Sequence, residues 1–138
     1  MPISYNQVFI HLIWGTWDRL PLISAGIEPR LYACLADKCR EHKCIPVTIG
    51  GVENHVHLLV KVYSTIAVAD LIKELKGSSS HLITHELAPD EFFKWQGSYG
   101  AISVNPEEIS VVEDYIHNQK QHHRENKLKF EWEKVEEG

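Results

Sequence analysis

Two histidines separated by one residue, His55 and His57, are the first feature with the chemistry of a functional site. They begin a stretch rich in β-branched and apolar residues, 55–63, which predicts a strand. Successive side chains of a strand point to opposite faces, so both imidazoles would lie on one face, their Cα atoms about 6–7 Å apart. Val56 would then point into the core. Imidazoles at this spacing can bind one metal ion, although two surface or hydrogen-bonded histidines would show the same pattern.

A second group of polar side chains follows helical spacing near the C-terminal end. Tyr115, Gln119 and His122 stand at i, i+4 and i+7 and would share one helix face. A phenol has a pKa of about 10 and is a poor nucleophile unless a metal ion or a base assists it. A tyrosine at a helix edge, with its hydroxyl in solvent, is the simpler interpretation of this residue alone. A separate stripe faces the core: Ile109, Val112 and Ile116.

The two groups together suit phosphoryl transfer. A metal ion held on the sheet would polarise a phosphodiester and stabilise charge on its oxygens. The Tyr115 phenolate would attack and conserve the bond energy in a phosphotyrosine. Gln119 could add a neutral oxygen ligand to the ion. Two imidazoles and an amide would by themselves favour a softer ion such as Mn²⁺ or Zn²⁺.

The elements that must position these groups follow the order β-α-β-β-α-β-α. A tight turn at Glu53-Asn54 would join two of the strands in a hairpin. The helix that begins near residue 67 is expected to end or be interrupted at 76–80; if it is only interrupted, 81–87 would continue it. Asn105 and Pro106 form a strong start for the last helix, which should run to about residue 123. The predicted strands are 5–14, 45–51, 55–63 and 95–104, and the other predicted helix is 28–43.

This order predicts an α+β fold, a ferredoxin-like or RRM-like split β-α-β sandwich. Its antiparallel sheet would carry helices on one face and leave the other face open or used for binding. The last helix would carry the tyrosine. A length of 138 residues supports one domain over 1–138.

The composition and net charge narrow the classes of function that this sequence could have. Hydrophobic residues make up 43% and charged residues 24%, a globular balance. No apolar run reaches the roughly 18 residues of a membrane helix, and no secretory signal is visible, so we expect a cytoplasmic protein. The net charge of −5 argues against binding nucleic acid by bulk charge. Residues 106–138 hold nine acidic and five basic side chains, so a nucleic-acid surface would lie in the remainder.

Five segments, taken in order, resemble the single-tyrosine transposases of small bacterial insertion sequences. These transposases belong to the HUH (His-hydrophobe-His) endonuclease superfamily, which includes the REP-associated tyrosine transposases. The combination of HVHLL, KGSSS and YxxxQ is far more specific than any one motif. Asn54 stands where the family often has Asp. The segments are HLIWGTWDRLPLI (11–23), GGVENHVHLLVKV (50–62), LIKELKGSSSHLI (71–83), KWQGSYGAISV (94–104) and VVEDYIHNQKQHH (111–123).

The resemblance implies a role for each motif. His55, His57 and Gln119 would hold a divalent metal ion, Mg²⁺ or Mn²⁺. Tyr115 would cleave single-stranded DNA, leaving a 5′-phosphotyrosine and a free 3′-OH, and rejoining would be the reverse attack. The DNA would carry hairpins at the element ends. The protein would be a homodimer in which the tyrosine helix of one subunit can complete the site of the other.

Other polar residues are candidates for DNA contact, with ordinary solvated side chains as the alternative. These are Arg19, Lys73, Lys76, Ser80 and His122. Two rival functions use the same motifs. A catalytically retired protein could bind DNA hairpins without cleavage. A metallohydrolase could use the histidines with water, in place of Tyr115, as the nucleophile.

Overall fold

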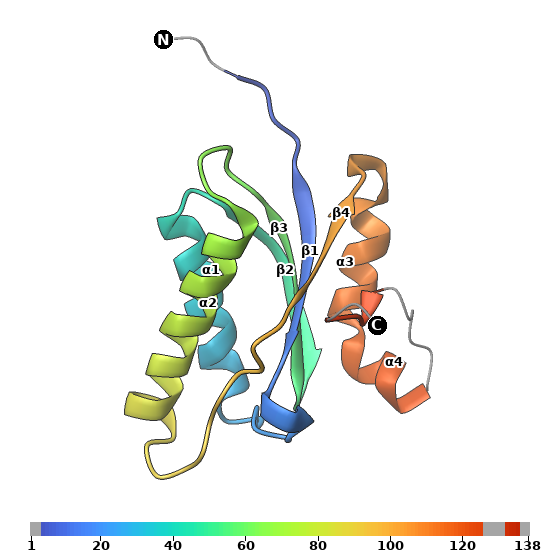
Figure 1. Ribbon diagram of the computed structural model, residues 1–138. Helices are drawn as coiled ribbons and strands as arrows, with labels where there is room; N and C mark the ends of the chain where they lie inside the picture. Colours follow the sequence, from blue (N-terminus) through green and yellow to red (C-terminus); the bar gives the residue numbers. More distant parts are fainter. Residues whose placement is uncertain (1–3, 126–131, 136–138) are drawn as a thin grey trace.

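The computed structural model describes residues 4–125 and 132–135, and four strands form its centre (Figure 1). They make one antiparallel sheet in the order β2-β3-β1-β4. This arrangement confirms the predicted α+β fold with a split β-α-β order. The hairpin between β2 and β3 turns at Glu53-Asn54, as predicted. The strands are β1 (Phe9–Gly15), β2 (Ile45–Val52), β3 (His55–Lys61) and β4 (Gly100–Val104).

Helices α1 (Glu28–Glu41) and α2 (Val68–Leu82) cover one face of the sheet (Figure 1). Alternate residues of the central strands supply the apolar side chains beneath them, because side chains of a strand alternate between faces. The larger hydrophobic core lies in this layer. It includes Leu12, Trp14, Val56 and Leu58 from the sheet and Leu31, Leu35, Leu71 and Leu75 from the helices, all fully buried.

Helix α2 does not end within residues 76–80. It continues to Leu82 and then into the π-helix η2 (Ile83–Leu87). The serine hydroxyls are accommodated within the helix because they bond to carbonyls one turn earlier. The Ser78 hydroxyl donates to the Glu74 carbonyl at 2.8 Å, and the Ser79 hydroxyl donates to the Leu75 carbonyl at 2.7 Å.

The last strand is shorter than predicted. Only β4 is regular, and Trp95 forms an isolated bridge with Thr16. Trp95 is instead held by packing. Its ring lies edge-on to Trp14, and its indole N–H donates to the Ser79 hydroxyl at 3.0 Å.

The opposite face of the sheet carries helices α3 (Ile109–His117) and α4 (Gln119–Glu125) (Figure 1). One 3₁₀ turn, η3 (Pro106–Glu108), precedes α3, and the Asn105 side chain caps it by accepting from the Glu107 amide. The predicted continuous helix is therefore divided. Asn118 leaves the helical conformation between α3 and α4, and its side-chain amide donates to the Asp114 carbonyl at 2.8 Å.

A smaller apolar cluster joins α3 to this face. It confirms that Val112 and Ile116 face a core, but that core lies on the other side of the sheet from α1 and α2. The cluster consists of Phe9, Leu59, Val104, Val112 and Ile116. No helix among the described residues is long and apolar enough to cross a membrane.

Candidate active site

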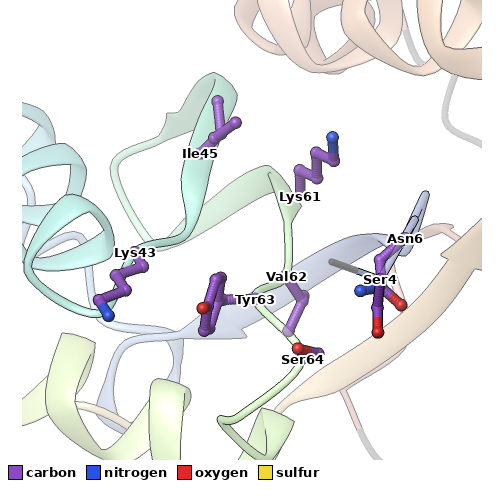
Figure 2. Close-up of a pocket in the computed structure, with 8 residues that line it drawn as sticks. All are labelled: Ser4, Asn6, Lys43, Ile45, Lys61, Val62, Tyr63 and Ser64. Atoms are coloured by element: carbon purple, nitrogen blue, oxygen red, sulfur yellow. The ribbon is translucent and has the colours of Figure 1, made fainter. Parts of the chain in front are cut away.

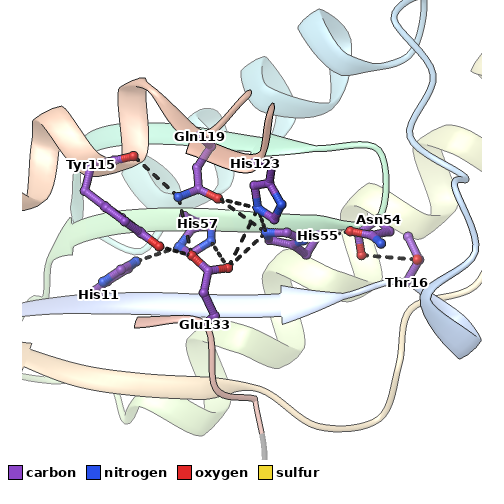
Figure 3. Close-up of polar contacts among 9 residues, drawn as sticks. All are labelled: His11, Thr16, Asn54, His55, His57, Tyr115, Gln119, His123 and Glu133. Carbon is purple, nitrogen blue, oxygen red and sulfur yellow. Dashed lines mark hydrogen bonds and ion pairs between the residues drawn. The ribbon is translucent and has the colours of Figure 1, made fainter. Parts of the chain in front are cut away.

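Strand β3 places the two histidines as the sequence predicts. His55 and His57 are buried and share the face that carries α3 and α4, while Val56 packs in the core with α1 and α2. Their Nε2 atoms point toward a common region above the sheet (Figure 3). The rings lie 5.1 Å apart, edge to face. The pair is therefore not a pair of surface histidines.

The other ring nitrogens are held by neighbours. The Asn54 Oδ1 atom lies 2.7 Å from His55 Nδ1 and can only accept, so Nδ1 carries the proton and the Nε2 lone pair faces the site. His57 Nδ1 shares a 2.8 Å hydrogen bond with His11 Nε2. Metal-ligating histidines are commonly oriented by such partners. The Asn54 side chain therefore fixes the orientation of the His55 ring.

His11 was not singled out from the sequence. It lies on β1 opposite Leu59, on the same face as the histidine pair, and is fully buried. Burial, together with the neighbouring His57, lowers the pKa of His11 to about 3. The pKa of His57 is also lowered, chiefly by burial. Both imidazoles are therefore held neutral near pH 7, the form that binds metal ions.

Tyr115 is buried within the site, with 4% of its surface exposed. The interpretation of a tyrosine at a helix edge with its hydroxyl in solvent is therefore wrong. The Tyr115 ring lies edge-on to His57 at 5.9 Å and stacks on His122 at 4.9 Å. Its hydroxyl donates to Glu133 Oε2.

Gln119 is the first residue of α4 and is buried beside the histidines. Its Oε1 atom lies 3.3 Å from His55 Nε2, as a shared ligand position requires. The Gln119 side chain also contacts His123, whose Nε2 lies 3.1 Å from Gln119 Oε1 and 3.1 Å from His55 Nε2. Burial and the neighbouring His55 lower the pKa of His123.

Glu133 is a second site residue, besides His11, that the sequence did not reveal. It stands in the 132–135 segment, and no spacing distinguishes it from the other acids near the C-terminal end. Its Oε1 atom lies 3.2 Å from His55 Nε2 and 3.1 Å from His57 Nε2 (Figure 3). Burial alone would raise the pKa of the Glu133 carboxyl. Contacts with His55, His57 and the Tyr115 hydroxyl outweigh burial and hold that pKa well below its usual range.

Two glycines let backbone segments approach the histidines. Gly50, His57, Ile13 and Gly100 stand opposite one another across the four strands. A Cβ atom on Gly50 would lie 2.1 Å from the Ile116 carbonyl oxygen of α3. A Cβ atom on Gly100 would lie 1.9 Å from the Lys134 carbonyl oxygen. One glycine therefore admits the tyrosine helix, and the other admits the segment that carries Glu133.

The predicted DNA contacts fall in two places. The Arg19 guanidinium lies against Gly15, beside Asn54, and His122 stacks on the tyrosine. The other three residues belong to α2, on the opposite face of the sheet. Among them, Lys76 donates to the Gln96 carbonyl at 2.7 Å and the Ser98 carbonyl at 2.9 Å. Burial lowers the pKa of Lys76. Lys73 is exposed and Ser80 is half-buried.

A separate cavity of about 200 Å³ lies near the end of β3 and the start of β2 (Figure 2). Lys43 and Tyr63 line it, with the Lys43 ammonium 5.3 Å from the centre of the Tyr63 ring. None of the residues around it belongs to the histidine and tyrosine cluster. It is therefore distinct from the candidate active site.

The donor set fits a divalent metal ion. One ligand atom each from His55, His57 and Glu133 lies within 4.8 Å of the others. The His55 Nε2 lone pair faces two oxygens that also accept, one from Gln119 and one from Glu133. Several acceptors that converge in a buried site need a positive charge among them, supplied by a proton or by a metal ion.

Comparisons with known proteins show the family of this chain. Residues 4–119 match the family model described as "Transposase IS200 like". The ISDra2 transposase TnpA of Deinococcus radiodurans is 25% identical over 118 residues, which cover 82% of this chain and 84% of that protein.

Two solved structures share the fold. One is a protein assigned as a transposase of Deinococcus radiodurans, with a TM-score of 0.67 and 23% identity, covering 86% of this chain and 96% of that one. The other is a REP-associated tyrosine transposase bound to a REP hairpin. Its TM-score is 0.66 and its identity 12%, covering 93% of this chain and 74% of that one.

Proposed function

This chain belongs to the family of IS200-like transposases, and from that membership we propose that it cleaves and rejoins single-stranded DNA through Tyr115. His55, His57 and Gln119 would hold the divalent ion, Mg²⁺ or Mn²⁺. When bound, the ion would polarise the scissile phosphodiester and offset charge on its oxygens. The observation that carries the proposal is the shared carboxylate. The Tyr115 hydroxyl and both histidine Nε2 atoms contact Glu133, so the nucleophile and the ligand atoms are adjacent within one chain.

The proposed reaction exchanges one phosphoester for another. The Tyr115 hydroxyl loses its proton as its oxygen forms a bond to phosphorus, and the bond from phosphorus to the 3′ oxygen breaks. The 3′ oxygen leaves as a hydroxyl after taking up a proton, and the 5′ phosphate stays on the tyrosine. Attack by another 3′-OH reverses the step and joins two strands. His57 and His122, which both contact the Tyr115 ring, would limit its rotation during attack.

The DNA partner would be a single strand with hairpins at the element ends, recognised in the cytoplasm. The related transposase solved with a REP hairpin supports this choice. Arg19 and His122 would contact the strand near the cleavage point. Lys73, Lys76 and Ser80 lie on α2 and would contact DNA away from that point, with Lys76 required first to leave its two carbonyl partners.

A homodimer that shares active sites is part of the proposal. Mixing His57→Ala and Tyr115→Phe proteins should then restore some cleavage, because a mixed dimer can join the intact tyrosine helix of one subunit to the intact histidines of the other. In the described chain, Tyr115 lies beside its own His57. Stable mixed dimers without rescue would indicate a site built within one chain.

The test is a covalent adduct assay. Purified protein is incubated with Mn²⁺ or Mg²⁺ and labelled single-stranded oligonucleotides from the flanks of its gene, then run on a denaturing gel. We expect a shifted band that survives boiling, needs the metal ion and is absent from Tyr115→Phe. Tyr63→Phe is the matched control, because its exposed side chain lines the separate cavity at the end of β3.

Other outcomes assign the rival functions. Metal-dependent cleavage that persists in Tyr115→Phe would identify water as the nucleophile. Hairpin binding that is unchanged by chelation, with no cleavage under any divalent ion, would identify a retired DNA-binding protein. Either result would overturn the proposal.

A further inference from the structure

Glu133 stands where a ligand of the metal ion would stand. Two ligand atoms about 2.1 Å from one ion, at an angle of roughly 90–110°, are separated by about 3.0–3.4 Å. The Glu133 Oε1 atom lies 3.2 Å from His55 Nε2 and 3.1 Å from His57 Nε2. Gln119 Oε1 lies 3.3 Å from the same His55 nitrogen. These separations are those of neighbouring ligands around one shared ion.

The charge of the site leads to the same assignment. His55, His57 and Gln119 are neutral donors and would leave a divalent ion with no compensating charge. The carboxylate of Glu133 is mostly enclosed, with 16% of its side chain exposed. Its presence changes the donor set to two nitrogens and two oxygens, one of them anionic. Such a set favours Mn²⁺ or Mg²⁺ more than two imidazoles and an amide do.

The position of Glu133 is fixed by packing on both sides. The Trp132 ring lies 5.9 Å from His11 and 5.0 Å from Tyr115, edge-on to each. Val135 is buried. The Lys134 carbonyl lies directly over Gly100, where no other residue type would leave room for it. The fold therefore holds this segment against the sheet, with the carboxylate aimed at the histidines.

We propose that Glu133 is a fourth, anionic metal ligand, which joins His55, His57 and Gln119. This inference rests on the proposed function, because it assumes that the histidines bind a metal ion. It adds a residue outside the three motifs that carry the resemblance. The second oxygen of Glu133 accepts from the Tyr115 hydroxyl, so one carboxylate links the nucleophile to the ion.

Mn²⁺ binding to the purified full chain, without DNA, tests the inference. Free Mn²⁺ is measured by electron paramagnetic resonance for the wild type, Glu133→Gln and His57→Ala. Glu133→Gln keeps the shape of the side chain and removes the charge. We expect it to weaken Mn²⁺ binding by at least about 10-fold, the scale on which metal-site partners act. Glu91→Gln is the control, because Glu91 is exposed and far from the site in the sequence.

A second variant moves Glu133 without changing a donor. Gly100→Ala places a methyl group where the Lys134 carbonyl lies, so it should displace the 132–135 segment and weaken Mn²⁺ binding in the same direction. Circular dichroism before each titration restricts the comparison to folded protein. Glu133→Asp, which keeps the charge on a shorter side chain, should bind Mn²⁺ better than Glu133→Gln.

The failures of the two proposals can be distinguished. Unchanged Mn²⁺ affinity in Glu133→Gln, with binding lost in His57→Ala, would overturn the role of Glu133 and leave the proposed function standing. Tighter Mn²⁺ binding together with faster adduct formation in Glu133→Gln would also overturn it, because the carboxylate would then compete with the DNA phosphate. Unchanged binding in His57→Ala would contradict the metal site itself.

Discussion

The two faces of the sheet are built from the same strands but differ in what they bury. Toward α1 and α2 the central strands present apolar side chains, which pack into the larger core. Toward α3 and α4 they present His11, His55 and His57, and only a small apolar cluster lies beside them. Burying polar side chains has a free-energy cost unless each finds a partner. The first face therefore supplies most of the stability, and the second uses the rigid strands to fix the site.

Neighbouring residues of β3 give the sharpest test of this division. His57 and Leu58 are adjacent but point to opposite faces. His57→Ala should abolish metal-dependent adduct formation, because a ligand is lost, and change the stability of the metal-free protein less. Leu58→Ala should lower the free energy of unfolding by about 2–5 kcal/mol, from lost burial and the cavity left behind. Urea unfolding in EDTA and the adduct assay measure the two effects.

The division would fail in a defined way. If folded Leu58→Ala lost Mn²⁺ affinity as completely as His57→Ala, stability and metal binding would not be divided between the two faces of the sheet.

Gly50→Ala should have the next largest effect, on the face of the sheet that carries α3, α4 and the histidines. Its methyl group would meet the Ile116 carbonyl, so α3 must move away from the sheet and take Tyr115 and Gln119 with it. A displacement of about 1 Å can cost roughly 100-fold in rate, and we expect a loss of that order in adduct formation. Gly97→Ala is the matched control, since a methyl group there meets nothing within 4 Å. Equal activity of the two variants would refute the close approach of α3.

The buried histidines on the face toward α3 and α4 should also make the free energy of unfolding depend on pH. The folded protein holds the pKa of His11 at about 3, against an ordinary value of 6.5. The unfolded chain therefore binds a proton as the pH falls below about 6.5, and the folded chain does not. Stability should be full above that pH and decline as the pH falls toward 3. The lowered pKa values of His57 and His123 act in the same direction.

Thermal unfolding at pH 8, 6 and 5, in EDTA, measures this decline. His11→Gln should show a shallower loss of Tm between pH 6.5 and 5 than the wild type. An identical slope would exclude His11 as a source of the pH dependence.

The smallest effect should come from a substitution in α2, on the face of the sheet that packs against the larger core. Gly77 lies inside α2, and a Cβ atom there meets nothing within 4 Å. Gly77→Ala should raise the free energy of unfolding by about 0.5–1 kcal/mol, because alanine loses less backbone entropy in a helix. Adduct formation and Mn²⁺ affinity should not change. A loss of Mn²⁺ affinity would show that α2 is coupled to the site through the sheet.

Local patterns predicted the parts of the site that depend on periodicity. Alternation along a strand placed both histidines of β3 on one face, and helical spacing placed Gln119 near Tyr115. The α+β order also followed from the sequence of strand-like and helical segments. The last strand, β4, is shorter than the predicted 95–104, because Trp95 is held by packing on Trp14 and Ser79 rather than by a ladder of backbone hydrogen bonds.

The remaining site residues depend on tertiary contacts that no local pattern records. Glu133 reaches the histidines because its segment returns over Gly100. His11 joins them through the pairing of β1 with β3. Lys76 looked like a free cation on a helix, but its ammonium donates to two carbonyls of the segment before β4.

The identity of the residue that carries the DNA tests the central claim most directly. After reaction with a single-stranded oligonucleotide and Mn²⁺, the protein is digested with protease and nuclease, and the nucleotide-bearing peptide is sequenced by mass spectrometry. We expect a 5′-phosphate nucleotide on Tyr115, and no such peptide from His57→Ala. A nucleotide attached to any other residue, or cleaved DNA with no attached peptide, would contradict it.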